Sequence, residues 1–272
     1  MTATEKTAWT GDTLRALLAR PPILDQPAIC DPLGARLAAD AGYQAVALGG
    51  HAIGAHLPLT SELSFDDIER AAAAVIRACG LPVLLDADIG WGGAGDIPAG
   101  LARLEAAGVA AVAVSSQYLP AQVPLSEAAE RSRAHADLLG RIRAARAART
   151  SLLVMARCAV AAGGSYDGAL GRAAGLLGAG ADALLLHAPA SQLPLFPRDL
   201  PGATLIYAGS AGPGPDVTAS QLQEWGYCGL SLQYHRCYCA RMRRTAPAAG
   251  PAAIASPGPA LTGSREDLER KP

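Results

Sequence analysis

The segment AGADALLLHA (179–188) joins an alanine-rich, helix-like stretch to a run of apolar residues through a glycine. A glycine just after a helix, followed within a few residues by an apolar strand, is typical of a short loop that leads from a helix into a strand. The same order of features occurs in AGYQAVALGG (41–50), AGVAAVAVSS (107–116) and WGYCGLSLQY (225–234). The chain therefore repeats a unit of helix, glycine and strand.

Further apolar runs predict four more strands, and they are PAICDP (27–32), PVLLDAD (82–88), SLLVMAR (151–157) and ATLIYAG (203–209). Helices are predicted between the strands at 33–41, 65–79, 97–107, 126–148, 167–179 and 218–225, with a weaker one near 190–199. Strands that are apolar almost throughout are buried on both faces, which is typical of a parallel sheet covered by helices. Eight such units predict an α/β fold, a closed (β/α)8 TIM barrel, in preference to an open doubly wound sheet.

The composition changes near residue 245, where the chain becomes rich in Pro, Ala and Gly. We expect a single barrel domain over 1–244, including an N-terminal helix, and a flexible C-terminal arm over 245–272 with at most a short helix at 264–270.

Charge and composition exclude several functions. The net charge of −1 gives no reason to expect a nucleic acid or an anionic membrane as partner. With no secretion signal, no apolar stretch long enough for a membrane span and only scattered cysteines, we expect a soluble cytoplasmic protein. Lys6 and Lys271 are the only lysines, so chemistry through a lysine imine is not expected.

Active sites of such barrels lie at the carboxyl ends of the strands. There, Asp86 and Asp88 end one strand at positions i and i+2, which point to the same face. Such a pair suits Mg²⁺, which takes one or two carboxylates and keeps several waters. The alternative is that one aspartate caps the following loop while the other pairs with Arg157.

Arg157 also ends a strand, and its guanidinium is expected either to bind a substrate carboxylate or to form that ion pair. His187 is a candidate acid, base or oxyanion donor, with a purely structural role as the alternative. The other strand ends contribute candidate substrate-binding residues, namely Gly49, Gly50, His51, Ser115, Ser116, Ser210 and His235.

The motif LLDADIGWGG (84–93) resembles the Asp-x-Asp-x-Gly-x-Gly motif of the isocitrate lyase/phosphoenolpyruvate mutase superfamily. The resemblance extends over about 13–244, through LRALLARPPIL, GARLAADAGYQAVALGGHAIG, VMARCAV and GRAAGLLGAGADALLLHAP. It implies a barrel enzyme that uses Mg²⁺, or Mn²⁺ in its place, to stabilise an enolate-like oxyanion while a C–C or P–C bond is made or broken.

By position, the resemblance assigns Asp86 and Asp88 to the metal, the Gly49 and Gly50 amides to the substrate oxyanion or carboxylate, and Arg157 to a substrate carboxylate. His187 stands where the mutase branch has a histidine. The resemblance further implies a homo-oligomer, a dimer or tetramer, for which 245–260 would serve as a crossing arm.

The chain departs from the superfamily pattern at several acids. Leu59, Ser115-Ser116 and Ala159 occupy positions where carboxylates are expected. The gating loop that carries Lys, Cys and His in lyases has Ala121 and Val123 at informative positions. Proton transfer would then depend on His187, His51, His235, Tyr118 or water.

Three functional hypotheses remain from the sequence. The first is a divergent lyase-type enzyme that acts on a small 2-oxo or 2-hydroxy acid. The second is a different reaction on the same scaffold, with or without a metal ion, in specialised biosynthesis. The third is a non-catalytic protein that binds a ligand at the barrel mouth.

Overall fold

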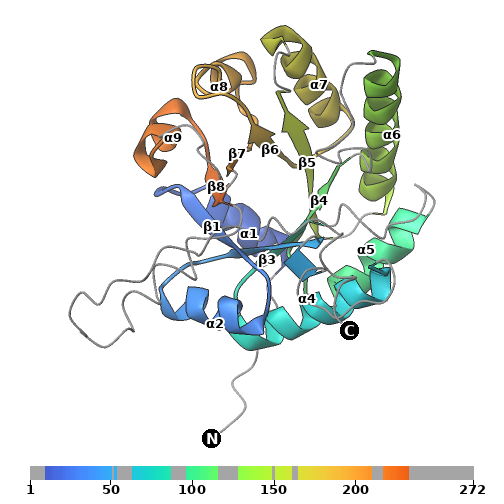
Figure 1. Ribbon diagram of the computed structural model, residues 1–272, viewed down its shortest axis with the longest axis vertical. Coiled ribbons are helices and arrows are strands. Elements are labelled where there is room, and N and C mark those ends of the chain that lie inside the picture. Colours follow the sequence, from blue (N-terminus) through green and yellow to red (C-terminus); the bar gives the residue numbers. More distant parts are fainter. Residues whose placement is uncertain are drawn as a thin grey trace, which may run out of the picture.

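The computed structural model describes residues 10–50, 52–53, 63–86, 96–115, 128–148, 151–160, 165–209 and 217–232. Within them, eight parallel strands form a closed barrel in the order β1-β2-β3-β4-β5-β6-β7-β8 (Figure 1). The predicted (β/α)8 barrel is confirmed, and the open doubly wound alternative is excluded because β1 pairs with β8. The proposed C-terminal arm, 245–272, lies outside the described residues.

The strands are β1 (Leu24–Ile29), β2 (Val46–Gly49), β3 (Val83–Asp86), β4 (Ala111–Val114), β5 (Leu153–Ala159), β6 (Ala183–His187), β7 (Leu205–Gly209) and β8 (Gly229–Leu232). The helices are α1 (Gly11–Leu18), α2 (Pro32–Asp40), α4 (Phe65–Cys79), α5 (Ile97–Ala106), α6 (Ala128–Ala147), α7 (Tyr166–Gly178), α8 (Leu195–Asp199) and α9 (Ala219–Trp225). In the described part of the chain, no helix has both the length and the apolar character needed to cross a bilayer.

The glycine of each repeated unit adopts the left-handed conformation that ends a helix. Gly42, Gly108, Gly180 and Gly226 have φ angles of 87°, 89°, 106° and 104°. A residue with a Cβ is strained at these angles, so glycine stabilises the turn into the next strand. This confirms the helix, glycine and strand unit predicted from the sequence.

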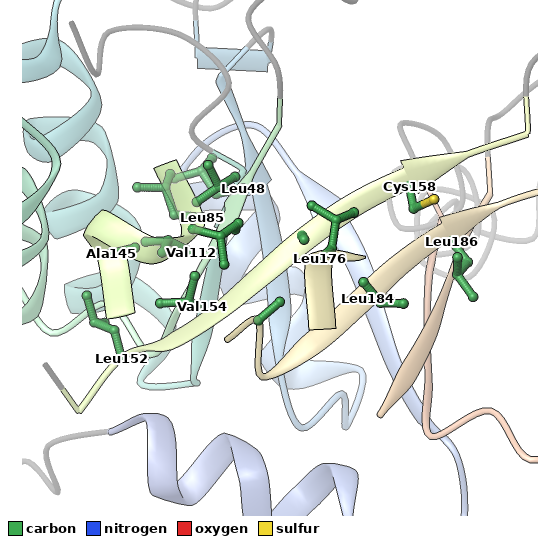
Figure 2. Packing of buried hydrophobic residues seen from close by; sticks show 14 of the residues in the cluster. Leu48, Leu85, Val112, Ala145, Leu152, Val154, Cys158, Leu176, Leu184 and Leu186 are labelled. Atoms are coloured by element: carbon green, nitrogen blue, oxygen red, sulfur yellow. The ribbon is translucent and has the colours of Figure 1, made fainter. Parts of the chain in front are cut away.

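The strands pack on both faces, as their apolar composition predicts. The outer layer fills the space between barrel and helices (Figure 2), where Ala145 of α6 and Leu176 of α7 lie against Val154 and Leu184. The inner layer combines small side chains, such as Ala47 and Ala113, with larger ones, such as Leu84, Met155 and Leu185.

Helix α1 closes the amino-terminal end of the barrel. Leu14 and Leu18 are buried with the inner layer. Gly11 lies so close to the chain before β5 that an added Cβ would be 2.0 Å from the Ser151 carbonyl oxygen. Arg15 pairs with Asp182 at the start of β6. With one end closed, the opposite end is the accessible one.

Strands β1 and β5 and helix α8 differ from the sequence prediction. Strand β5 is Leu153–Ala159 instead of 151–157, so Arg157 lies two residues before its end. Strand β1 begins at Leu24, three residues before the predicted start at Pro27, and therefore includes Gln26. Helix α8 has 5 residues, Leu195–Asp199, and does not fill the predicted 190–199 region, because its start follows Pro194 and a series of turns.

Candidate active site at the barrel mouth

Asp86 and Arg157 form an ion pair at the carboxyl end of the barrel. Arg157 Nη2 donates to Asp86 Oδ2, and the two side chains are 18% and 16% exposed, respectively. Of the two alternatives for Arg157, the structure shows the pair with Asp86. A guanidinium and a carboxylate held together in this partly buried setting attract each other more strongly than they would at the surface.

The register of the strands explains how these two residues meet. Asp86 is level with Ala113 on β4, and Ala113 is level with Met155 on β5. Arg157 lies two positions beyond Met155, on the same face of β5. Because Ala113 has only a methyl group, it leaves room for Arg157 to cross strand β4 and reach Asp86.

Gly49 and Gly50 lie beside this pair. Gly49 is the register partner of Asp86 on β2, and an added Cβ at Gly50 would lie 3.4 Å from the Asp86 carbonyl oxygen. The close approach favours glycine at this position and brings the backbone of the β2 end to the mouth. Ser115, just after β4, is also buried here, with 4% exposure.

His187 ends β6 on the inward face and is exposed at the mouth. Its Nδ1 lies 2.9 Å from the Ala208 carbonyl oxygen on β7. A carbonyl only accepts hydrogen bonds, so the neutral ring carries its proton on Nδ1 and leaves Nε2 as an acceptor. This tautomer suits a group that takes a proton from a bound molecule.

A small pocket that opens to solvent, with a cavity volume of about 30 Å³, lies at the mouth. Its charged wall is Asp86 and Arg157, and small side chains form much of the rest, among them Ala28, Ala47, Ala208 and Ser231. Leu185, the residue level with Arg157 on β6, adds an apolar surface. The pocket therefore offers one cation, one carboxylate and a compact apolar volume, which suits a small acid.

The structure brings together five of the predicted residues, namely Gly49, Gly50, Asp86, Ser115 and Arg157, with His187 on the adjoining rim. The remaining predicted residues, Asp88, His51, Ser116, Tyr118, Ser210 and His235, lie outside the described residues. Among those described, no cluster of three or more His, Cys, Asp or Glu side chains is placed to hold a metal ion.

Sequence reasoning did not identify the residues that form the floor and walls of the pocket. Ala28, Ala47, Ala208 and Ser231 are ordinary strand residues in the sequence. The two-residue alternation of β1 from Leu24 would have placed Gln26 and Ala28 on the inward face. A strand that begins at Pro27, as the sequence predicts, does not include Gln26.

The chain matches known proteins over most of its length. A family model described as phosphoenolpyruvate phosphomutase matches residues 14–246. The chain is 30% identical over 226 residues to 2-methylisocitrate lyase from Bacillus subtilis (strain 168), covering 78% of this chain and 72% of that enzyme. It is 28% identical over 225 residues to 2,3-dimethylmalate lyase from Eubacterium barkeri, covering 80% and 78%.

Solved structures have the same fold. The crystal structure of phosphonopyruvate hydrolase in complex with oxalate and Mg²⁺ superposes with a TM-score of 0.67 at 24% identity, covering 95% of this chain and 93% of that one. At this identity the likeness concerns the fold, and it confirms the barrel architecture described above.

Proposed function

The chain belongs to the phosphoenolpyruvate phosphomutase family, and on this basis we propose that its barrel mouth binds a small 2-oxo or 2-hydroxy acid and catalyses lyase-type cleavage or formation of a C–C bond. The observation that carries the proposal is the Asp86–Arg157 pair in a small pocket at the catalytic end of the barrel. The two relatives described above are both lyases of small carboxylic acids, which supports this class of reaction.

Arg157 is the proposed carboxylate-binding residue. Its planar guanidinium has several donors, so it can exchange its bond to Asp86 for a two-point contact with a substrate carboxylate, or make both at once. The apolar surfaces of Ala28, Ala47 and Leu185 then surround the carbon skeleton. Exclusion of water from this pocket strengthens each charge interaction within it.

Asp86 fits one part of a Mg²⁺ site. Its carboxylate is a hard oxygen donor at the mouth, and Mg²⁺ needs only one or two carboxylates besides water and substrate oxygens. We propose Asp86 and Asp88 as the residues that would hold Mg²⁺, with Mn²⁺ as a possible substitute. When bound, the ion would supply positive charge next to an oxygen on which negative charge develops.

The remaining roles follow from position. Gly49 and Gly50, beside Asp86, are the proposed backbone contacts to the substrate oxyanion, together with Ser115. His187, with Nε2 as acceptor, is the proposed proton-transfer residue. His51, Ser116, Ser210 and His235 remain proposed neighbours of the substrate from their positions at predicted strand ends, and Tyr118 remains a proposed proton-transfer residue.

A turnover screen tests the proposal. Purified protein is incubated with a panel of 2-oxo and 2-hydroxy acids and Mg²⁺ or Mn²⁺, and products are identified by NMR, with chelator-treated protein and Arg157→Met as controls. We expect metal-dependent product formation that Arg157→Met abolishes. Turnover that persists in chelator would favour the metal-independent reaction, and binding without turnover would favour the ligand-binding protein.

The proposal also includes a homo-oligomer, a dimer or tetramer, from the sequence resemblance, and a cytoplasmic location, from the composition of the chain. Light scattering tests the assembly. A particle of two or four chains is expected, whereas a species of 27.6 kDa, the mass of one chain, would contradict it.

A further inference from the structure

Gln26 is a fully buried amide without a hydrogen-bond partner among the residues that the structure describes. The residue is 0% exposed, and neither Oε1 nor Nε2 has a partner. A carboxamide has two donors and an acceptor with two lone pairs. Leaving such a group unsatisfied in the interior destabilises a fold, and it is retained in native proteins mainly where it serves another purpose.

Gln26 is located directly below the mouth pocket. It lies on the inward face of β1, between Leu24 of the buried inner layer and Ala28 of the pocket lining. Its register partner on β8 is Ser231, which also lines the pocket. The amide is therefore one layer deeper than the pocket and on the same side of the strand.

Several side chains of the pocket wall on the neighbouring strands are short. Ala28, Ala47 and Ala208 contribute only methyl groups to it, beside the larger Leu84 and Leu185. The glutamine side chain has three rotatable bonds, so a change of rotamer can bring its amide toward the pocket without moving the backbone.

We propose that Gln26 is a specificity-determining residue that hydrogen-bonds an uncharged oxygen of the substrate, a hydroxyl or a carbonyl, while Arg157 binds the substrate carboxylate. This rests on the proposed function of the same pocket and names the substrate class more narrowly: a small carboxylic acid that also carries a neutral oxygen.

The chemistry of the pocket favours this class. Arg157 is the one cationic side chain among the described residues that line it, and Asp86 already balances its charge. A neutral amide suits a neutral oxygen, to which it can donate a hydrogen bond or from which it can accept one. A site built to hydrogen-bond an oxygen discriminates strongly against an analogue that lacks it, because its own polar group is then left unpaired.

The test compares matched acids on matched variants. Binding of propionate, lactate, 3-hydroxypropionate and pyruvate is measured by NMR titration in the presence of Mg²⁺, for wild type, Gln26→Leu and Gln26→Met. We expect wild type to bind at least one oxygenated acid more tightly than propionate. Both variants should lose this preference, by about five- to tenfold, with propionate affinity unchanged.

Thermal unfolding gives an independent readout. Both variants replace an unsatisfied amide by an apolar group of similar size, so their melting temperatures should equal or exceed that of wild type. Leu24→Met, one layer below on the same face, is the control and should leave the binding preference intact.

The outcomes separate the two claims. The role of Gln26 is refuted if wild type prefers an oxygenated acid and both Gln26→Leu and Gln26→Met keep that preference. It is also refuted if wild type binds all four acids equally. In both cases the proposed acid-binding function of the pocket still stands. If wild type binds none of the acids, the proposed function fails and the role of Gln26 with it.

Discussion

Asp86 at the end of β3 and Arg157 in β5 are 71 positions apart in the chain and form an ion pair across strand β4 at the mouth of the barrel. The pair joins the strand that carries the aspartate motif to the strand that carries the arginine. A charged pair held on two rigid strands is a suitable place to receive a small charged ligand, because little has to be reorganised on binding.

Disruption of this pair should destabilise the protein. Removing one partner leaves a partly buried charge uncompensated, so Asp86→Asn and Arg157→Met should each lower the free energy of unfolding by about 2–4 kcal/mol. The double variant should be less destabilised than the sum of the two, with a coupling energy of at least about 1 kcal/mol. Urea denaturation measures all three, and additive losses would show that the pair contributes nothing.

The Nε2 atom of His187 can be tested separately from its Nδ1 atom. In His187→Asn the side-chain amide can replace Nδ1 in its contact with Ala208, whereas His187→Gln offers a group near the position of Nε2. Neither amide can accept a proton, so we expect both variants to lower kcat by about 10²–10⁴-fold. Their melting temperatures should differ, with His187→Asn closer to wild type. A fully active His187→Asn would assign the residue a structural role.

The opposite end of the barrel provides a control for effects on stability. Asp182 Oδ2 accepts from the Val154 backbone N–H at 2.9 Å, and Oδ1 accepts from Arg15 of α1 at 2.9 Å. Asp182→Ala leaves the buried amide without its acceptor and should cost about 1–3 kcal/mol, whereas Asp182→Asn can keep that bond and should cost less. Ligand affinity per folded molecule should not change in either variant. A loss of affinity in Asp182→Asn would contradict the separation of the two ends.

His135 on α6 predicts a pH dependence of stability. Burial, followed by the positive charge of Arg172, lowers the pKa of His135 below its usual value of 6.5. The unfolded state therefore binds the proton more readily, so stability should fall as the pH decreases below about 6.5 and level off below the folded-state pKa. His135→Gln should make the free energy of unfolding less sensitive to pH over this range. The free energy of unfolding is measured by calorimetry between about pH 7.5 and 5. The same dependence on pH in His135→Gln and wild type would contradict this role of His135.

The barrel could be predicted from the sequence because its determinants are local. Each glycine after a helix specifies a left-handed turn, as at Gly180, and each apolar run that follows specifies a strand buried on both faces. These signals recur along the chain, so an error in one unit does not change the architecture. The β1 boundary was wrong because Gln26 and Pro27 are both unusual in a central strand.

The site was predictable only in part, because its contacts are not local. The end of each strand indicates which residues lie near the mouth. Asp86 ends β3 and His187 ends β6, whereas Arg157 lies two residues before the end of β5. Whether Arg157 pairs with Asp86 depends on the small side chain of Ala113 on the strand between them. The tautomer of His187 depends on a carbonyl of the neighbouring strand, at Ala208. Neither relationship is encoded in the spacing of the residues concerned.

The most direct test of the account is a calorimetric titration of pyruvate into wild-type protein and Arg157→Met, each in the presence of Mg²⁺. We predict saturable binding to wild type and an affinity at least about tenfold weaker in Arg157→Met, because a charge-assisted contact to the carboxylate is lost. Equal affinity in the two proteins, or no binding to wild type, would contradict the claim that this pocket receives a small acid.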